Sequence, residues 1–133
     1  MNSEQRTYWP INTNLGVLRQ RIHRYATRVG LTGMRREDLL LAVHEAAINV
    51  LEHGGGSGTV TLWHNKRNLT VNIVDIAGRL TPHDVHRRLP FPRVQRGFGL
   101  WLIGQLCDEF TIHQERGRSH VRLRMRLHPI PAL

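Results

Sequence analysis

A strict two-residue alternation runs through residues 119–128, SHVRLRMRLH, where Val121, Leu123, Met125 and Leu127 alternate with arginines. Successive side chains of a β-strand point to opposite faces of a sheet, so this pattern is typical of a strand with one buried face and one solvated face. The preceding run EFTIHQE, residues 109–115, and an intervening Arg-Gly-Arg turn complete a predicted hairpin. Such a sheet needs a second layer over its apolar face, and the rest of the chain must supply that layer.

Two helices are predicted upstream. The first covers about residues 15–29, where apolar residues recur at helical spacing, with Asn14 as its N-terminal cap and Gly30 as its C-terminal stop. The second covers about residues 33–53 and has Thr32 as its expected cap. Both are amphipathic, which suits helices that cover a sheet.

Three further strands and a third helix are predicted around them. Residues 6–12 form an expected edge strand, because Pro10 is poorly tolerated in a central strand. Residues 59–65 and 68–76 alternate as the two arms of an antiparallel hairpin. The third helix is expected to start near Gly99.

The element order therefore predicts an α+β fold: a two-layer sandwich of a mostly antiparallel mixed sheet, four to five strands wide, with about three helices on one face. The basic face of the sheet is expected to stay open to water or a partner. A length of 133 residues suits a single domain over residues 1–133. Residues 76–96 are predicted as loop, with one short helix from Thr81-Pro82.

Composition narrows the classes of function. No apolar run is long enough to span a bilayer and no signal peptide is apparent, so a cytoplasmic protein without membrane contact is expected. The single cysteine, Cys107, excludes an internal disulfide and a multi-thiolate zinc site, and it is expected to be a buried structural thiol. The net charge of +9 favours anionic partners such as a nucleotide, a nucleic acid or an acidic protein surface.

The predicted helix 33–53 carries Glu45, Asn49 and His53 at four-residue intervals and then runs into HGGGSG. At about 100° per residue these side chains share one face, opposite the apolar residues. A solvated polar face is the simpler interpretation. However, asparagine is a poor mid-helix residue, and glycines allow a backbone to approach a ligand closely, so a polar ligand on this face is the alternative.

Two other segments contain candidate binding residues. Gly97 and Gly99 precede the expected third helix, where free backbone amides can bind phosphate. Asp75 ends a predicted buried strand and Gly78 follows it, which fits either a turn-forming aspartate or an acceptor for a base amino group. Neither the dinucleotide fingerprint nor the P-loop is present, and Ile48 stands where a zinc-protease motif needs histidine. A metal site at the loop residues His83 and His86 is not expected.

The order Glu-x3-Asn-x3-His, Asp-x2-Gly, Gly-x-Gly resembles that of the GHKL, or histidine-kinase-like, ATPase superfamily, most closely the anti-sigma-factor serine kinases of bacteria. The segments LAVHEAAINVLEHG and RGFGLWLIGQLCDEF are the most specific, and the resemblance covers about residues 8–127. It implies an ATP- and Mg²⁺-dependent protein-serine kinase. Such a kinase sequesters a sigma factor and phosphorylates a serine on an anti-sigma-factor antagonist of the STAS type. The family also makes a homodimer plausible.

The resemblance also implies roles for individual residues. Asn49 would hold Mg²⁺ through its carboxamide oxygen, and Glu45 would be the catalytic base that receives the proton of the partner serine. Asp75 would bind the adenine amino group, the glycines would admit phosphates to backbone amides, and Arg96 would add positive charge. The residues expected to contact the cofactor are Asn49, His53, Asp75, Gly78, Arg96, Gly97, Gly99 and Leu100.

One departure leaves alternatives open. The family's second motif usually reads Asp-x-Gly-x-Gly, whereas here Asp75 is followed by Ala77 and Arg79, with Gly78 shifted by one position. A partner-binding module of the same fold with weak or lost catalysis is therefore the first alternative. A basic nucleic-acid-binding protein is the second, although aromatic residues are few and no nucleic-acid motif is recognised.

Overall fold

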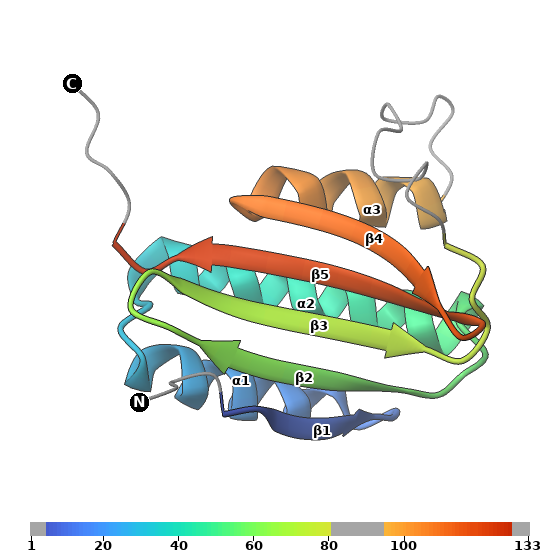
Figure 1. Cartoon of the computed structure of the whole chain (residues 1–133), viewed down its shortest axis with the longest axis horizontal. Helices are drawn as coiled ribbons and strands as arrows, with labels where there is room; N and C mark the ends of the chain where they lie inside the picture. Colours follow the sequence, from blue (N-terminus) through green and yellow to red (C-terminus); the bar gives the residue numbers. More distant parts are fainter. Residues whose placement is uncertain (1–4, 81–94, 129–133) are drawn as a thin grey trace.

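The fold is known from a computed structural model that describes residues 5–80 and 95–128, with the backbone alone for residues 95–98. Five strands form one sheet in the order β1-β2-β3-β5-β4, and every pairing among them is antiparallel. Figure 1 shows this sheet in front of the helices. The strands are β1 Thr7–Ile11, β2 Gly58–His64, β3 Asn68–Asp75, β4 Glu109–Glu115 and β5 Arg118–Arg126.

Three helices complete the described part of the chain: α1 Leu15–Arg28, α2 Gly33–His53 and α3 Gln95–Leu106. In Figure 1, α1 and α2 lie behind the sheet and α3 runs alongside β4. The predicted α+β fold with helices layered on an antiparallel sheet is confirmed.

The alternation in β5 has the predicted consequence. Val121, Leu123 and Met125 are at most 4% exposed and belong to the hydrophobic core under the helices. β5 is paired on both sides, with β3 and with β4, so it lies inside the sheet. Its nearly continuous apolar face is consistent with this position. Pro10 lies in β1 at the edge of the sheet, as predicted.

The predicted helix and strand ends are close to the observed ones, apart from the start of α3. The Asn14 side chain accepts a hydrogen bond from the Val17 amide at 3.3 Å, so this cap is confirmed. Thr32 occupies the N-cap position of α2, but its side chain makes no capping hydrogen bond. β5 begins at Arg118, because the turn before it needs only Arg116 and Gly117, both with positive φ. β5 also ends at Arg126, two residues before the predicted end at residue 128.

α3 differs most from its prediction, because it begins at Gln95 rather than near Gly99. Gly97 and Gly99 therefore lie inside the helix, where glycine costs about 1 kcal/mol relative to alanine. The close packing of α3 on α2, described below, accounts for Gly99 in the helix. The predicted short helix at Thr81-Pro82, as well as His83 and His86, lies outside the described residues.

The open face of the sheet is covered by arginine side chains instead of a second layer. The Arg6 guanidinium stacks on the Trp63 ring, 4.0 Å from its centroid, and Arg122 lies 5.1 Å from the same centroid. Trp63 is only 6% exposed as a result. Arginine stems thus shield an aromatic residue while their charges stay in water.

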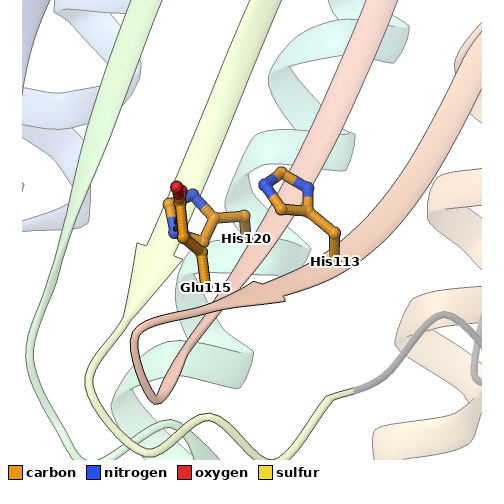
Figure 2. Close-up of side chains that lie close together, drawn as sticks. All are labelled: His113, Glu115 and His120. Atoms are coloured by element: carbon orange, nitrogen blue, oxygen red, sulfur yellow. Dashed lines mark ion pairs between the residues drawn. The ribbon is translucent and has the colours of Figure 1, made fainter.

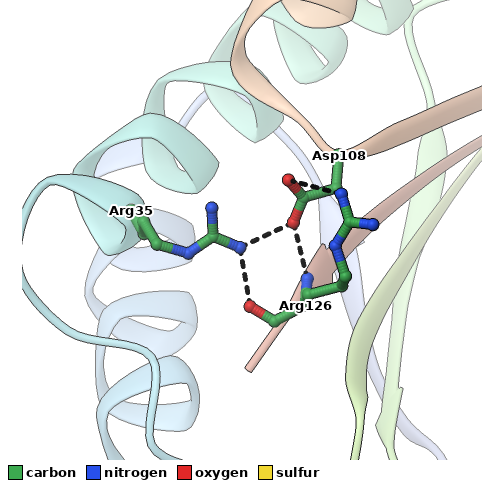
Figure 3. Close-up of polar contacts among 3 residues, drawn as sticks. All are labelled: Arg35, Asp108 and Arg126. Carbon is green, nitrogen blue, oxygen red and sulfur yellow. Dashed lines mark hydrogen bonds and ion pairs between the residues drawn. The ribbon is translucent and has the colours of Figure 1, made fainter. Parts of the chain in front are cut away.

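A polar cluster joins α2, the α3–β4 connection and the end of β5 (Figure 3). Asp108 Oδ2 accepts hydrogen bonds from Arg35 Nη2 at 2.6 Å and from the Arg126 amide at 2.7 Å. Arg35 Nη2 also donates to the Arg126 carbonyl at 2.6 Å. The carboxylate, with a side chain 17% exposed, therefore ties three segments that are far apart in the sequence.

The surroundings of Asp108 act on its pKa in both directions. Burial raises the pKa of Asp108. The hydrogen bonds from Arg35 and the Arg126 amide, together with the two guanidinium charges, lower it by more, so the net shift is downward. A carboxyl group whose pKa is lower in the folded protein stabilises the fold above its unfolded pKa of about 3.9. That contribution is lost as the pH falls toward the folded pKa.

We therefore expect Asp108→Asn to lower the free energy of unfolding by about 1–2 kcal/mol at neutral pH, the difference between a charged and a neutral hydrogen-bond acceptor. The two stabilities should start to converge below about pH 4 and meet as the pH falls through the lower folded pKa, where the wild-type carboxyl becomes protonated in the folded protein too. Urea unfolding at several pH values measures this. Glu109→Gln is the control, because the Glu109 side chain is 59% exposed and its ion pair with Arg124 is a surface pair. A constant gap between Asp108→Asn and wild type down to pH 2 would contradict the assignment.

Cys107 is half-buried against the core, and its thiol has a raised pKa of about 12, mainly because of burial and also because of Asp108 and Asp38. The thiol is therefore protonated at neutral pH, in agreement with a structural role. Within the described residues, no helix is long and apolar enough to cross a membrane.

Candidate functional site

The polar face of α2 meets α3. Glu45 and Asn49, one helical turn apart, are both half-buried. A β-carbon built on Gly99 of α3 would lie 3.4 Å from Glu45 Oε2 and 3.5 Å from Asn49 Nδ2. The two side chains therefore lie between α2 and α3 and do not point into bulk solvent.

Gly99 allows this contact. A side chain at this position would be at tight or ordinary van der Waals distance from both polar groups. The glycine thus lets α3 approach the polar face of α2 while the carboxylate and carboxamide remain in place.

Two polar atoms on this face lack a hydrogen-bond partner among the residues that the structure describes. Asn49 Nδ2 and His53 Nε2 are both buried and have no hydrogen bond to any described residue. His53 Nε2 has the Glu52 carboxylate nearby, at 3.7 Å from Oε2. Buried polar groups are nearly always hydrogen-bonded, so each such atom needs an explanation, and a polar ligand between the helices is one.

Asp75 lies at the end of β3, close to the C-terminal end of α2. Its side chain is almost fully buried, at 4% exposed, and Oδ1 accepts hydrogen bonds from the amides of Ala77 at 3.0 Å and Gly78 at 2.9 Å. One carboxylate oxygen therefore shapes the turn, which was one of the two predicted roles. No described hydrogen bond uses Oδ2, so that oxygen remains available to an amino group of a ligand.

Gly78 is required by the backbone. Its φ is +64°, and a β-carbon there would lie 2.2 Å from the Gly117 carbonyl oxygen of the β4–β5 turn. Its own carbonyl accepts a hydrogen bond from Gln114 Nε2. Two residues later, the Leu80 backbone exchanges two hydrogen bonds with Ser119 Oγ, at 3.0 and 2.9 Å. The segment after Asp75 is thus docked on the β4–β5 hairpin.

Arg79, the residue that departs from the family's second motif, has a defined contact. Its Nη1 donates a hydrogen bond to the His53 carbonyl at 3.3 Å. This carbonyl is at the C-terminal end of α2, where a cation is electrostatically favourable. The arginine therefore links the segment after β3 to the end of the helix that carries Glu45 and Asn49.

The remaining predicted residues lie in α3. Gly97 and Arg96 are in its first turn, where backbone amides are free of helical partners, but the Arg96 side chain lies outside the described part of the structure. Leu100 is 2% exposed, and its side chain belongs to the hydrophobic core.

The glycines after α2 have a role that sequence reasoning missed. They were expected to let the backbone approach a ligand, but they let α2 approach β3 and the residues that follow it. A β-carbon on Gly54 would lie 2.8 Å from the Asp75 β-carbon, and one on Gly55 would lie 2.6 Å from the Ile76 side chain. Gly58 begins β2, and a β-carbon there would lie 2.2 Å from the Val74 carbonyl oxygen of the paired strand β3. Only the glycine-rich composition hinted at this packing.

The chemistry of the side chains between α2 and α3 suits a hard cation. Mg²⁺ is bound by carboxylate and amide oxygens, usually one or two from the protein and the rest from phosphates and water. Glu45 and Asn49 offer one carboxylate and one carboxamide, one turn apart on one helix. The Asn49 carboxamide oxygen is therefore a ligand that fits such an ion, with the Glu45 carboxylate one turn away.

Comparisons with known proteins agree with this geometry. The family model described as the histidine kinase-like ATPase domain matches residues 9–125, which include α2, β3 and α3. No curated protein matches the chain significantly.

Proposed function

Because the chain belongs to the histidine kinase-like ATPase domain family, an ATP-binding family, we propose that it is an anti-sigma factor with Mg²⁺-dependent protein-serine kinase activity. It would hold a sigma factor inactive and phosphorylate a serine on a STAS-type antagonist protein. The phosphorylated antagonist would then dissociate. This reading rests on the α2 and α3 sequences that resemble the small anti-sigma kinases.

The observation that supports this proposal most is the position of Glu45 and Asn49 against Gly99. A carboxylate and a carboxamide are half-buried one turn apart, and the neighbouring helix has no side chain at the point of contact. A purely structural polar face would not need a buried amide that has no hydrogen-bond partner within the described part of the chain.

In the proposed reaction, the chain mainly positions its substrates, as in other phosphoryl transfers. Asn49 would hold the metal ion through Oδ1, and Glu45 would accept the proton of the serine hydroxyl. Mg²⁺, when bound, neutralises charge on the phosphates. Asp75 Oδ2, which no described hydrogen bond uses, would accept a hydrogen bond from the adenine amino group, and the first turn of α3 would direct backbone amides to the phosphates.

The proposed partners agree with the charge of the chain. A net charge of +9 and the arginine-covered sheet face favour association with acidic protein surfaces. Sigma factor, STAS-domain antagonist and a second copy of the chain are the three proposed partners.

The direct test is binding of a non-hydrolysable ATP analogue, measured by calorimetry with and without Mg²⁺. We expect Asn49→Ala to remove the Mg²⁺-dependent part of the affinity, at least about tenfold, because a charged or metal-bound contact is worth about 1.4 kcal/mol or more. Asn12→Ala is the matched control, because Asn12 is exposed and lies before α1. Equal Mg²⁺-dependent affinity in wild type and Asn49→Ala would show that Asn49 is not the metal ligand.

A second candidate is a partner-binding module with weak or lost catalysis. Two observations favour it: Asp75 Oδ1 is used within its own turn, and Arg79 is bonded to the end of α2 at a position where the family usually has glycine. Tight binding of a partner protein together with no detectable binding of the ATP analogue would support this candidate over the kinase.

A further inference from the structure

Three potential metal ligands lie together on the open face of the β4–β5 hairpin, away from α2 (Figure 2). His113 and His120 are direct cross-strand partners, and Glu115 is two residues after His113 on the same face of β4. Side chains at i and i+2 of a strand and at the facing position of its neighbour point the same way.

The distances allow one ion to contact all three side chains. Their ligand atoms all lie within 4.8 Å of one another, and His120 Nε2 is 3.8 Å from Glu115 Oε2. Zinc–nitrogen and zinc–oxygen bonds of about 2.0–2.2 Å at tetrahedral angles separate ligand atoms by roughly 3.4 Å. Side-chain rotations bring the three ligand atoms together: Glu115, 62% exposed, is free to move, and the stacked rings of His113 and His120 must turn so that their lone pairs converge.

Histidine stacking alone does not account for the group. The His113 and His120 rings lie 4.6 Å apart between centroids and are inclined by 17°. Stacking explains why the two imidazole rings are neighbours, but it does not explain why a carboxylate lies beside them. Glu115 adds the third ligand, and its Oε2 approaches the ring nitrogen Nε2 of His120.

Asn72 supplies an independent observation. Its Nδ2 lies 3.2 Å from His120 Nδ1, while its Oδ1 is buried and has no hydrogen-bond partner. The two ends of an asparagine amide are assigned from the hydrogen-bond network, so the inverted amide is equally admissible. In that orientation Oδ1 accepts a hydrogen bond from Nδ1–H of His120. The oxygen is then hydrogen-bonded, Nδ2 takes the buried position without a described partner, and the lone pair of Nε2 is directed toward Glu115.

We propose that His113, Glu115 and His120 bind one Zn²⁺ ion on the open face of the sheet, with Asn72 fixing the tautomer of His120. Two imidazoles and one carboxylate form a zinc set of three protein ligands, which leaves the fourth position to water or another ligand. A ligating histidine commonly donates its other N–H to a side-chain or backbone oxygen, as here to Asn72.

This site is distinct from the one between α2 and α3. The hairpin cluster lies on the opposite face of the sheet, and its imidazole ligands suit zinc, whereas Glu45 and Asn49 offer only oxygen ligands. Within residues 5–80 and 95–128, no other group of three histidine, cysteine or acidic side chains has ligand atoms this close.

The neighbouring arginines are expected to weaken the affinity for Zn²⁺. Arg6, Arg116 and Arg118 line a groove of about 650 Å³ that also contains Glu115 and His120. Their positive charges oppose a divalent cation. We therefore expect affinity weaker than that of a closed four-ligand zinc site, but still one ion per chain.

The test uses the untagged full chain, stripped with a chelator and titrated with Zn²⁺ by calorimetry. We expect a stoichiometry of one, with affinity lowered about 10–100-fold in Asn72→Ala and at least as much in His113→Ala and His120→Ala. The matched control is His128→Ala, an exposed histidine beyond the end of β5. Circular dichroism of each variant verifies that the fold is kept.

The results that overturn the proposal are specific. One is the absence of stoichiometric Zn²⁺ binding by the wild type. Another is unchanged affinity in both His113→Ala and His120→Ala. A third is an equal loss in His128→Ala. The Asn49→Ala variant should bind Zn²⁺ like the wild type, so failure of the proposed kinase function would leave this result unaffected.

Discussion

The substitution Glu45→Gln is expected to lower phosphoryl transfer to a serine of a STAS-type antagonist by about 10²–10⁴-fold, the usual contribution of a positioned general base. Glutamine has nearly the same shape as glutamate but cannot accept the proton of the serine hydroxyl. The amide should still pack against Gly99, so the affinity for Mg²⁺-ATP should change little. Transfer of label from radiolabelled ATP to the antagonist measures the first quantity, and calorimetry measures the second.

Glu37→Gln is the matched control. Glu37 is on the same helix and undergoes the same change, but its side chain is 54% exposed and pairs only with the adjacent Arg36 among the described residues. Transfer by this variant should equal that of the wild type. If Glu45→Gln transferred phosphate at the wild-type rate, Glu45 would not be the base. If the wild type bound Mg²⁺-ATP but transferred no phosphate to any antagonist, the partner-binding module would be favoured instead.

The second large effect concerns stability. Gly78→Ala is expected to lower the free energy of unfolding by about 3 kcal/mol or more, because it combines left-handed strain with a clash against backbone. The φ of Gly78 is +64°, and the added β-carbon would lie 2.2 Å from the Gly117 carbonyl oxygen. Neither atom belongs to a flexible side chain that could move aside. Thermal unfolding should show a decrease in Tm of roughly 10 °C or more.

Gly117→Ala separates the two causes. Gly117 also has a positive φ, +75°, but a β-carbon there has no neighbour within 4 Å. This variant should lose only about 1 kcal/mol, the strain term alone. Equal losses in the two variants would mean that the contact between Gly78 and the hairpin does not contribute.

Local patterns predicted most of the elements. The period of two in β5, the helical spacing in α1 and α2, and the turn residues between β2 and β3 are interactions between near neighbours in the chain. Asn65 illustrates this, because its Oδ1 accepts hydrogen bonds from the amides of Arg67 and Asn68, both at 2.8 Å. The position of Glu45 beside Asn49 was equally predictable, since helical geometry alone places them on one face.

Other parts of the site could not be predicted, because they depend on contacts between distant segments. Gly99 was expected ahead of a helix, yet it lies inside α3, where packing on α2 outweighs the low helix propensity of glycine. The glycines after α2 were expected near a ligand, but the strand beside them requires their lack of a side chain. No local pattern shows which backbone will pass within contact distance.

The amino-acid sequence by itself determined the types of the elements and the register of Glu45, Asn49 and His53 along one helix, because both follow from the fixed period of the backbone. The tertiary structure alone decided that β5 lies between β3 and β4 and that Asp108 joins Arg35 to Arg126. It also decided that His113, Glu115 and His120 meet on the open face. Strand order and inter-element contacts depend on how apolar surfaces of distant segments are buried together, and the periodicity of a single segment carries no information about its neighbours.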